Sequence, residues 1–290
     1  MLFFNNQQKG IIMQLQKPIT LSELQSSTLI NASAKKWAID NLEYLNKPMT
    51  FFGSSKKVEK GADKFNTYVM YLQPADKVAT KTLCAMADAA GCKKPCLISS
   101  GQLGMSVGQN AATKRTVLML LRHGYFVTSI LREIDKAERK ALRDNIPALF
   151  RLNGTSDLNF TYIIDQRPQS QFYDYSKNLS HLKRSRPNYD VTFSGSMYST
   201  QSRAALKKAI AQKHRIAMAW NTKNLKSDLI ATDSSFKSFD DTDLRHLDEN
   251  VIGTLTRKGS SIKERNLENM KKDSFFITAA NIEEFKSMVA

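Results

Sequence analysis

Several familiar signals are missing from this sequence. No apolar run approaches the roughly 20 residues that a membrane-spanning helix needs. The opening stretch MLFFNNQQKGIIMQLQ lacks the basic, apolar and small-residue regions of a secretory signal. No Walker A loop, dinucleotide fingerprint after a strand, HExxH or GxSxG pattern occurs. These absences disfavour membrane and secreted proteins and those enzyme classes. We expect a cytoplasmic protein with no membrane partner.

Acidic residues are scarce relative to basic ones, with 27 Asp and Glu against 43 Lys and Arg, a net charge of +16. This imbalance favours a polyanionic partner, nucleic acid in particular. The excess is uneven, because residues 178–215 hold eight basic side chains and a single acid, Asp190. The predicted nucleic-acid-binding residues of this basic stretch are Lys183, Arg184, Arg186, Lys207 and Lys208. The alternative is a generic basic surface.

Cysteine is also rare, yet all three cysteines fall in one thirteen-residue segment, CAMADAAGCKKPC. An odd number of thiols cannot pair completely into disulfides, and in a reducing compartment a cysteine cluster indicates metal binding. Cys84, Cys92 and Cys96 are therefore predicted to ligate a metal, as a four-iron iron–sulfur cluster or alternatively as zinc. The four histidines are scattered, so no fourth ligand is assigned. The alternative is that three small thiols simply pack in the interior.

The pattern of apolar residues predicts an α/β fold. Residues 1–54 give an irregular start and helical pieces, an N-terminal helical extension, and residues 55–290 form an α/β domain that carries the cysteines. Helical periodicity covers residues 111–145, with a break near Gly124. Short strands are predicted at 68–72, 148–152, 171–175, 189–193, 215–220 and 251–255, several of them followed by helical stretches. Repeated βα units predict a mostly parallel sheet or a partial (β/α) barrel.

Polar residues follow several of these strands, where α/β proteins bind ligands. The loop NGTSD suits a phosphate, a ribose or a sugar, although its residues could equally cap the next helix. The segment FYDYSK could orient a substrate or form a core strand. Together these strand ends supply the predicted cofactor-binding residues Asn153, Thr155, Ser156, Asp157, Asp174, Lys177 and Ser194.

The segments CLISSGQLG (96–104), RLNGTSD (151–157), FYDYSK (172–177), TFSGS (192–196) and DTDLRHLD (241–248) occur in this order. Together they resemble a phage-encoded family of unknown function related to the gene-product-88 type, over roughly residues 55–280. The resemblance implies a bacteriophage or prophage origin, hence the host cytoplasm, and a largely α/β fold. It implies no established activity.

A more distant similarity is to radical S-adenosylmethionine enzymes, which hold a four-iron cluster with three cysteines on the loop after the first barrel strand. Cys84, Cys92 and Cys96 would take that role, and S-adenosylmethionine would be the implied cofactor. The spacing CX7CX3C departs from the usual CX3CX2C. No Gly-Gly-Glu follows the next predicted strand.

Three hypotheses follow. The first is a phage protein with a metal or iron–sulfur site, in its strongest form an enzyme that acts on nucleic acid or nucleotides. The second is a non-enzymatic protein that binds DNA or RNA through the basic stretch. The third is a protein that engages a host factor.

Overall fold

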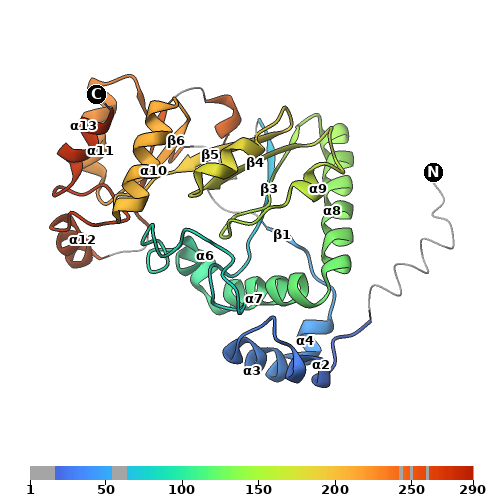
Figure 1. Cartoon of the computed structure of the whole chain (residues 1–290). Coiled ribbons are helices and arrows are strands. Elements are labelled where there is room, and N and C mark those ends of the chain that lie inside the picture. The colour runs from blue at the N-terminus through green and yellow to red at the C-terminus, as the bar shows by residue number, and fades with distance from the viewer. Residues whose placement is uncertain (1–16, 54–63, 242–243, 249–250, 259–260, 290) are drawn as a thin grey trace.

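The computed structural model describes residues 17–53, 64–241, 244–248, 251–258 and 261–289 (Figure 1). Eight strands form one sheet in the order β1-β2-β3-β4-β5-β6-β8-β7. Their bounds are β1 (Phe52–Gly53), β2 (Asn66–Met70), β3 (Ala148–Arg151), β4 (Gln171–Ser176), β5 (Tyr189–Ser194), β6 (Ile216–Trp220), β7 (Phe236–Ser238) and β8 (Ile252–Thr256).

The sheet is parallel except at one edge. β1 runs antiparallel to β2, and every other neighbouring pair is parallel. From β2 to β6 the strands lie side by side in chain order, without the reversal of a doubly wound sheet. This order is that of a partial (β/α) barrel, left open because β1 and β7 lie at opposite edges. The predicted α/β fold with a mostly parallel sheet is confirmed.

Helices connect most of the parallel strands. The helices before the sheet are α2 (Leu21–Ser26), α3 (Ala32–Asp40) and α4 (Leu42–Asn46). Those between and after the strands are α6 (Gly101–Gly104), α7 (Ser106–Leu121), α8 (His123–Asp144), α9 (Thr161–Ile164), α10 (Thr200–Ala211), α11 (Lys223–Thr232), α12 (Ile262–Asn269) and α13 (Ile282–Val289). Three 3-10 helices complete them: η1 (Leu97–Ser99), η2 (Leu179–Arg184) and η3 (Arg245–Leu247).

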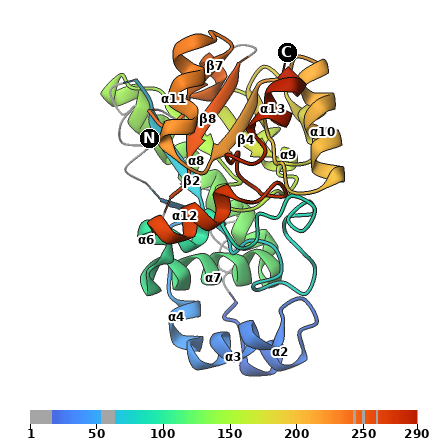
Figure 2. The ribbon, with the colours of Figure 1, turned by 90° about the vertical axis from the view of Figure 1, so that its left-hand side faces the viewer.

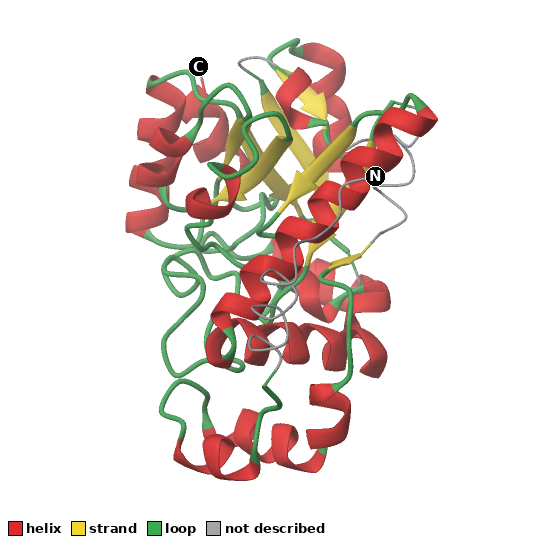
Figure 3. Cartoon of the chain, turned by 90° about the vertical axis from the view of Figure 1, so that its right-hand side faces the viewer, coloured by secondary structure: helices red, strands yellow, loops and turns green. Residues whose placement is uncertain are grey.

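The two faces of the sheet are covered differently. Alternate strand residues such as Phe150, Phe172 and Met218 join a large core with the apolar sides of the helices. The opposite face carries a small cluster around Leu149 and Tyr173, to which no α-helix of the described chain contributes. Right-handed crossovers return the helices that connect consecutive parallel strands to the same face, which explains this asymmetry. Figure 3 shows the helices wrapped around the strands.

The apolar stripe predicted for residues 111–145 lies on α8. Its members Phe126, Ile130, Ile134 and Ala141 are all buried, as predicted. The break between the two helices falls at Arg122, which caps both α7 and α8, two residues before the predicted Gly124. α8 ends at Asn145, whose left-handed conformation (φ 52°) turns the chain towards β3.

The N-terminal extension packs on α7 through buried hydrogen bonds. Lys114 of α7 is fully buried, and its Nζ donates to the carbonyl oxygens of Tyr44 and Lys47 at the end of α4. Arg122 pairs with Glu23 of α2 at 2.7 Å. The extension then supplies β1 to the sheet. The predicted domain boundary at residues 54 and 55 stays a prediction, because residues 54–63 lie outside the described part of the chain.

A long connection leaves the first parallel strand. Residues 71–96, named here the β2–η1 connection, contain no helix or strand, and all of them lie in the described part of the chain. Connections of this length without regular structure are uncommon in compact domains and are usually functional. In Figure 2 the connection, coloured teal, lies beside α7 and below α10.

Gly154 allows the loop after β3 to close on the end of β2. Its N–H donates to Met70 O at 2.9 Å, and a Cβ at this position would stand 2.6 Å from that backbone oxygen. We expect Gly154→Ala to lower the free energy of unfolding by about 1–3 kcal/mol, the usual cost of overpacking. Urea unfolding measures this. In the control, Gly53→Ala, the nearest atoms would lie at 3.9 and 4.0 Å, so little change is expected. Equal midpoints for the two variants would contradict the close approach.

Candidate functional site

The candidate site lies where the parallel strands end, named here the carboxyl edge. Several hydrogen bonds fasten the β2–η1 connection to this edge, three of them on either side of Cys84. The N–H of Asp157, after β3, donates to Leu83 O at 3.0 Å. The hydroxyls of Ser196 and Ser199, after β5, donate to Ala90 O at 2.8 Å and Ala89 O at 2.6 Å. The segment between the first two cysteines is thereby held against the ends of β3 and β5.

Close packing holds the same segment in place. Gly91 has φ +64°, in the left-handed region that favours glycine, and a Cβ there would stand 2.4 Å from atoms of the Tyr198 ring. Tyr198 itself follows β5. The chain between Cys84 and Cys92 therefore passes directly over this ring.

The three predicted metal ligands are free, half-buried thiols near one another. Burial raises the pKa of Cys84 to about 12, and negative charges on Asp157, Cys92 and Cys96 would raise it too. Burial also raises the pKa of Cys96, which the positive charges of Lys77 and Lys177 partly offset. Cys84 and Cys96 are therefore neutral thiols at pH 7. Among the described residues, no three Cys, His, Asp or Glu side chains already form a group that could hold a metal ion. Metal binding stays a prediction.

Three of the predicted cofactor-binding residues form a buried hydrogen-bond network, and a fourth, Thr155, bonds separately to the β2–η1 connection. Asp174 accepts from the backbone N–H of Asn153 at 2.8 Å and from its Nδ2 at 3.1 Å. Ser156 donates to Asn153 Oδ1 at 2.9 Å, and Thr155 donates to Leu72 O. These side chains shape the loop after β3. The alternative that the loop caps the next helix is wrong, because the N-cap residue of α9 is Phe160 and no side chain caps this helix. Their role in ligand binding stays a prediction.

Asp157, Ser176 and His181 form a second cluster at this edge. They come from the loop after β3, the end of β4 and η2 respectively. Ser176 Oγ donates to the Asp157 carboxylate at 2.8 and 2.9 Å. His181 Nδ1 lies 2.9 Å from Asp157 Oδ1 and 3.0 Å from Ser176 Oγ. Neither Ser176 nor His181 was predicted as a site residue. Ser176 lies within the segment FYDYSK, of which only Asp174 and Lys177 were selected, whereas His181 stands in no recognisable motif and only η2 brings its ring back to the strand end.

Lys177 and Ser194, two further predicted residues, meet at the ends of β4 and β5. Lys177 Nζ donates to Ser194 Oγ at 2.7 Å and lies 4.5 Å from the centre of the Phe275 ring. The positive charge of Lys177 also lowers the pKa of the Cys96 thiol. The structure thus brings Asp157, Lys177 and Ser194 to the same edge as the thiols.

The helix-free face of the sheet is closed at the end opposite the carboxyl edge. Leu244 packs there on Leu149 and Tyr173. Next to it, the buried Arg245 guanidinium stacks 3.7 Å from the Phe239 ring centre and pairs with Asp248 at 3.0 Å. Leu244 and Arg245 thus cover part of the face that carries this small cluster.

The basic stretch is partly used within the protein. Arg186 forms an ion pair with Asp165, and Arg184 Nη1 donates to Leu158 O at 3.4 Å. Lys183, on η2, and Lys207 and Lys208, on α10, are exposed. Nucleic-acid binding by these residues stays a prediction. None of the described helices is long and apolar enough to cross a membrane.

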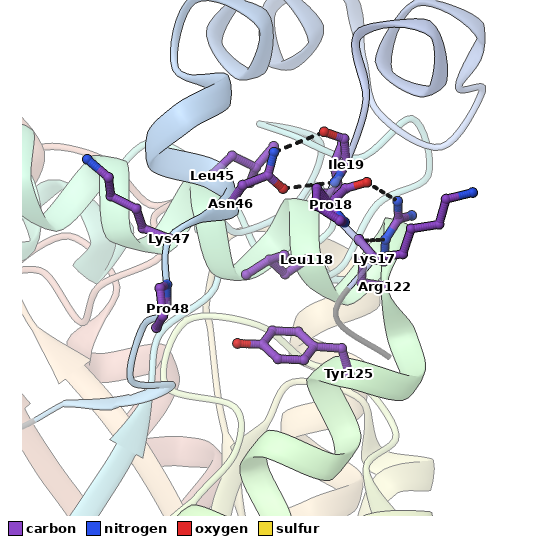
Figure 4. A pocket seen from close by; sticks show the side chains of 10 residues that line it. All are labelled: Lys17, Pro18, Ile19, Leu45, Asn46, Lys47, Pro48, Leu118, Arg122 and Tyr125. Atoms are coloured by element: carbon purple, nitrogen blue, oxygen red, sulfur yellow. Dashed lines mark hydrogen bonds between the residues drawn. The ribbon is translucent and has the colours of Figure 1, made fainter. Parts of the chain in front are cut away.

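A cavity of about 110 Å³ lies between the N-terminal extension and the junction of α7 and α8, away from the carboxyl edge (Figure 4). Asn46 and Ile19 exchange two hydrogen bonds beside it, at 2.8 and 2.9 Å. Arg122 Nε donates to Lys17 O at 3.0 Å. The first pair holds the extension together, and Arg122 fastens it to the domain.

The buried Asp174 should make stability depend on pH. Burial raises its pKa to about 6, against the opposing effect of Arg151. Between about 4 and about 6 the folded chain therefore binds one more proton than the unfolded chain, so the free energy of unfolding falls as pH rises, by up to about 3 kcal/mol. We expect Asp174→Asn to remove this slope, measured by urea unfolding at several pH values. The exposed Asp241→Asn should keep it. The same slope in both variants would contradict a raised pKa for Asp174.

Comparison with known proteins places the chain in a family. A family model described as gene product 88 matches residues 45–273, which include the whole sheet and all three cysteines. The match confirms the resemblance to the gene-product-88 type, and the similarity to radical S-adenosylmethionine enzymes stays a prediction. No curated protein and no solved structure matches the chain significantly. The chain therefore belongs to the gene product 88 family, a phage-type family of unknown function.

Proposed function

We propose that this gene product 88 protein binds a metal ion or an iron–sulfur cluster through Cys84, Cys92 and Cys96. The observation that carries the proposal is the position of these thiols. All the cysteines of the chain lie in the connection that follows the first parallel strand. This connection is hydrogen-bonded to the loop after β3 and to the loop after β5.

The electrostatics of the thiols support a bound cation. Burial and mutual repulsion of charges keep Cys84 and Cys96 protonated. A metal ion reverses this balance, because it is attracted to the thiolates and displaces their protons. The β2–η1 connection has no helix or strand to break, so its side chains can turn towards one another when a metal binds. Lys77 and Lys177 would offset part of the negative charge of three thiolates.

The strand order favours the catalytic form of this proposal. A sheet in chain order with three thiols after its first parallel strand resembles the arrangement in radical S-adenosylmethionine enzymes. A four-iron cluster held by three thiolates would leave one iron open to S-adenosylmethionine. Polar side chains from neighbouring strand ends, Lys177 and Ser194 among them, would then face the cluster. In this form the protein is an enzyme that acts on nucleic acid or nucleotides.

Metal analysis of the anaerobically purified protein tests the proposal. We expect iron with acid-labile sulfide, or zinc, in stoichiometric amounts. Cys92→Ser should lose most of this metal, because a hydroxyl is a much poorer ligand for either centre. Ser99→Ala changes an exposed residue of the neighbouring η1 and serves as the matched control, with full metal content expected. A metal-free protein, or a Cys92→Ser variant with unchanged metal, would contradict the proposal.

Nucleic-acid binding is the second candidate function. Lys207 and Lys208 lie side by side on the exposed surface of α10, and neither forms an ion pair with a described residue. Such lysines are available to neutralise phosphates, as a net charge of +16 would favour.

Salt dependence tests this second function. We expect the protein to bind DNA or RNA with an affinity that falls steeply as salt rises, since each neutralised phosphate releases counterions. The double variant Lys207→Ala, Lys208→Ala should bind about tenfold more weakly and lower the slope of log K against log salt by about 2. Lys35→Ala with Lys36→Ala on α3 removes the same charge elsewhere and should change affinity less. Equal losses in the two double variants would exclude α10 as the binding surface.

A further inference from the structure

Two cations at the carboxyl edge have no carboxylate partner in the described part of the chain. Lys177 comes directly after β4, and Arg257 comes directly after β8. None of the ion pairs among the described residues includes either side chain. Both residues are half-buried, so each charge is partly removed from water. A partly buried charge without an opposite charge beside it favours the binding of an anion.

The Lys177 ammonium is held in place by neutral groups. Its Nζ donates to Ser194 Oγ at 2.7 Å and lies 4.5 Å from the centre of the Phe275 ring. Burial raises the pKa of the Cys96 thiol, which is therefore protonated and offers no charge to Lys177. The Asp157 carboxylate accepts from the backbone N–H of Lys177 at 3.2 Å. A hydroxyl and a ring orient an ammonium but leave its charge in place, and two of its three donors remain for a ligand.

Arg257 is held in a similar way. Its Nη1 donates to the Oδ1 atom of the fully buried Asn221 at 3.0 Å. Its guanidinium lies 4.8 Å from the centre of the Phe276 ring. A guanidinium carries five N–H donors in a planar fork that matches the oxygens of a phosphate. Most of these donors are still available to an anion.

Two acids within reach of the Arg257 charge are bonded to other groups. Glu264 accepts from the backbone N–H of Ser261 at 2.8 Å, where it caps α12. Glu268 accepts from Ser274 Oγ at 2.6 Å. Neither forms an ion pair with Arg257 among the described residues. The charge of the guanidinium is therefore not matched by a bonded acid.

The segment 274–277 brings the two cations together across the strand ends. It pairs with Met197 after β5 and with Trp220 at the end of β6. Its two phenylalanines, Phe275 and Phe276, have ring centres 5.0 Å apart, and each ring carries one of the cations. Both cations therefore lie along one stretch of the carboxyl edge, which is where α/β proteins bind ligands.

We propose that Lys177 and Arg257 bind the phosphate monoester group of a ligand, supplied either by a free nucleotide or by the 5′-phosphorylated end of a nucleic acid. A monoester carries about two negative charges at pH 7, whereas each diester link of a nucleic acid carries one, so two cations match the monoester better. Tyr198, the residue after Met197, is 44% exposed and offers an aromatic surface to a base. This inference goes beyond the proposed metal binding, because it requires none of the three thiols.

Calorimetric titration of the full-length protein tests the proposal with two pairs of probes. The first pair is adenosine 5′-monophosphate and adenosine, and the second is a single-stranded oligonucleotide with and without a 5′-phosphate. We expect the phosphorylated probe to bind at least tenfold more tightly than its partner. A preference within the first pair assigns a free nucleotide, and a preference within the second pair alone assigns a nucleic-acid end. Equal binding within both pairs, or no binding, would overturn the proposal.

Substitutions then test the two cations. Lys177→Gln and Arg257→Gln should each weaken binding of the phosphorylated probe by at least tenfold, whereas Lys177→Arg keeps the charge and should retain most of the affinity. Lys136→Gln and Arg139→Gln remove the same charges from exposed positions on α8 and are the matched controls. Equal midpoints in urea unfolding establish that the variants are folded. A phosphate preference that survives both Lys177→Gln and Arg257→Gln would overturn the site, whatever the metal content of the protein.

Discussion

The parallel pairing of β2 to β6 in chain order is the constraint on which the rest of this structure depends. Parallel strands require a crossover each time, and right-handed crossovers return all the helices to one face. The small apolar cluster on the other face receives no α-helix of the described chain, and Leu244, at the start of η3, covers part of it. The parallel strands all end at the carboxyl edge. Cys84, Asp157 and Ser196 are distant in the sequence, and the contacts of the β2–η1 connection with the loops after β3 and β5 bring them to this edge.

Electrostatics at this edge follow from burial more than from the net charge of the chain. The protein is strongly basic, yet several arginines of the basic stretch bond to carbonyl oxygens or to acids such as Asp165. At the edge itself, burial raises the pKa of Cys84 and Cys96 and keeps both thiols neutral. The positive charges of Lys77 and Lys177 lower the pKa of Cys96 and so partly oppose this effect. The raised pKa values leave both thiols protonated at pH 7, and they are therefore poor nucleophiles. Burial also raises the pKa of Asp174, and the hydrogen bonds that it accepts from Asn153 and Tyr189 partly offset this rise.

Most of the fold could be predicted because its strands are apolar and regularly spaced. Six predicted strands correspond to β2, β3, β4, β5, β6 and β8 within two residues at each end. β1 and β7 were missed, since strands of two and three residues leave no alternating pattern to detect. The helix break was predicted at Gly124, the residue of lowest helix propensity, whereas the chain turns at Arg122. There the ion pair with Glu23 and the bond to Lys17 O outweigh local preference.

The site was less predictable, for a physical reason. Local composition determines that cysteines cluster and that polar residues follow strands, so Cys84, Asp157, Lys177 and Ser194 could all be nominated from the sequence. Whether a polar side chain faces a ligand or its own loop depends on partners far along the chain. Asn153 turned inward because Asp174 of the next strand accepts its hydrogen bonds. Ser176 is the last residue of β4, whereas His181 carries no sequence signal and only the path of η2 brings its ring to Asp157. The local sequence pattern thus determined the helices, the strands and the cysteine cluster. Long-range packing alone determined which side chains lie together at the carboxyl edge.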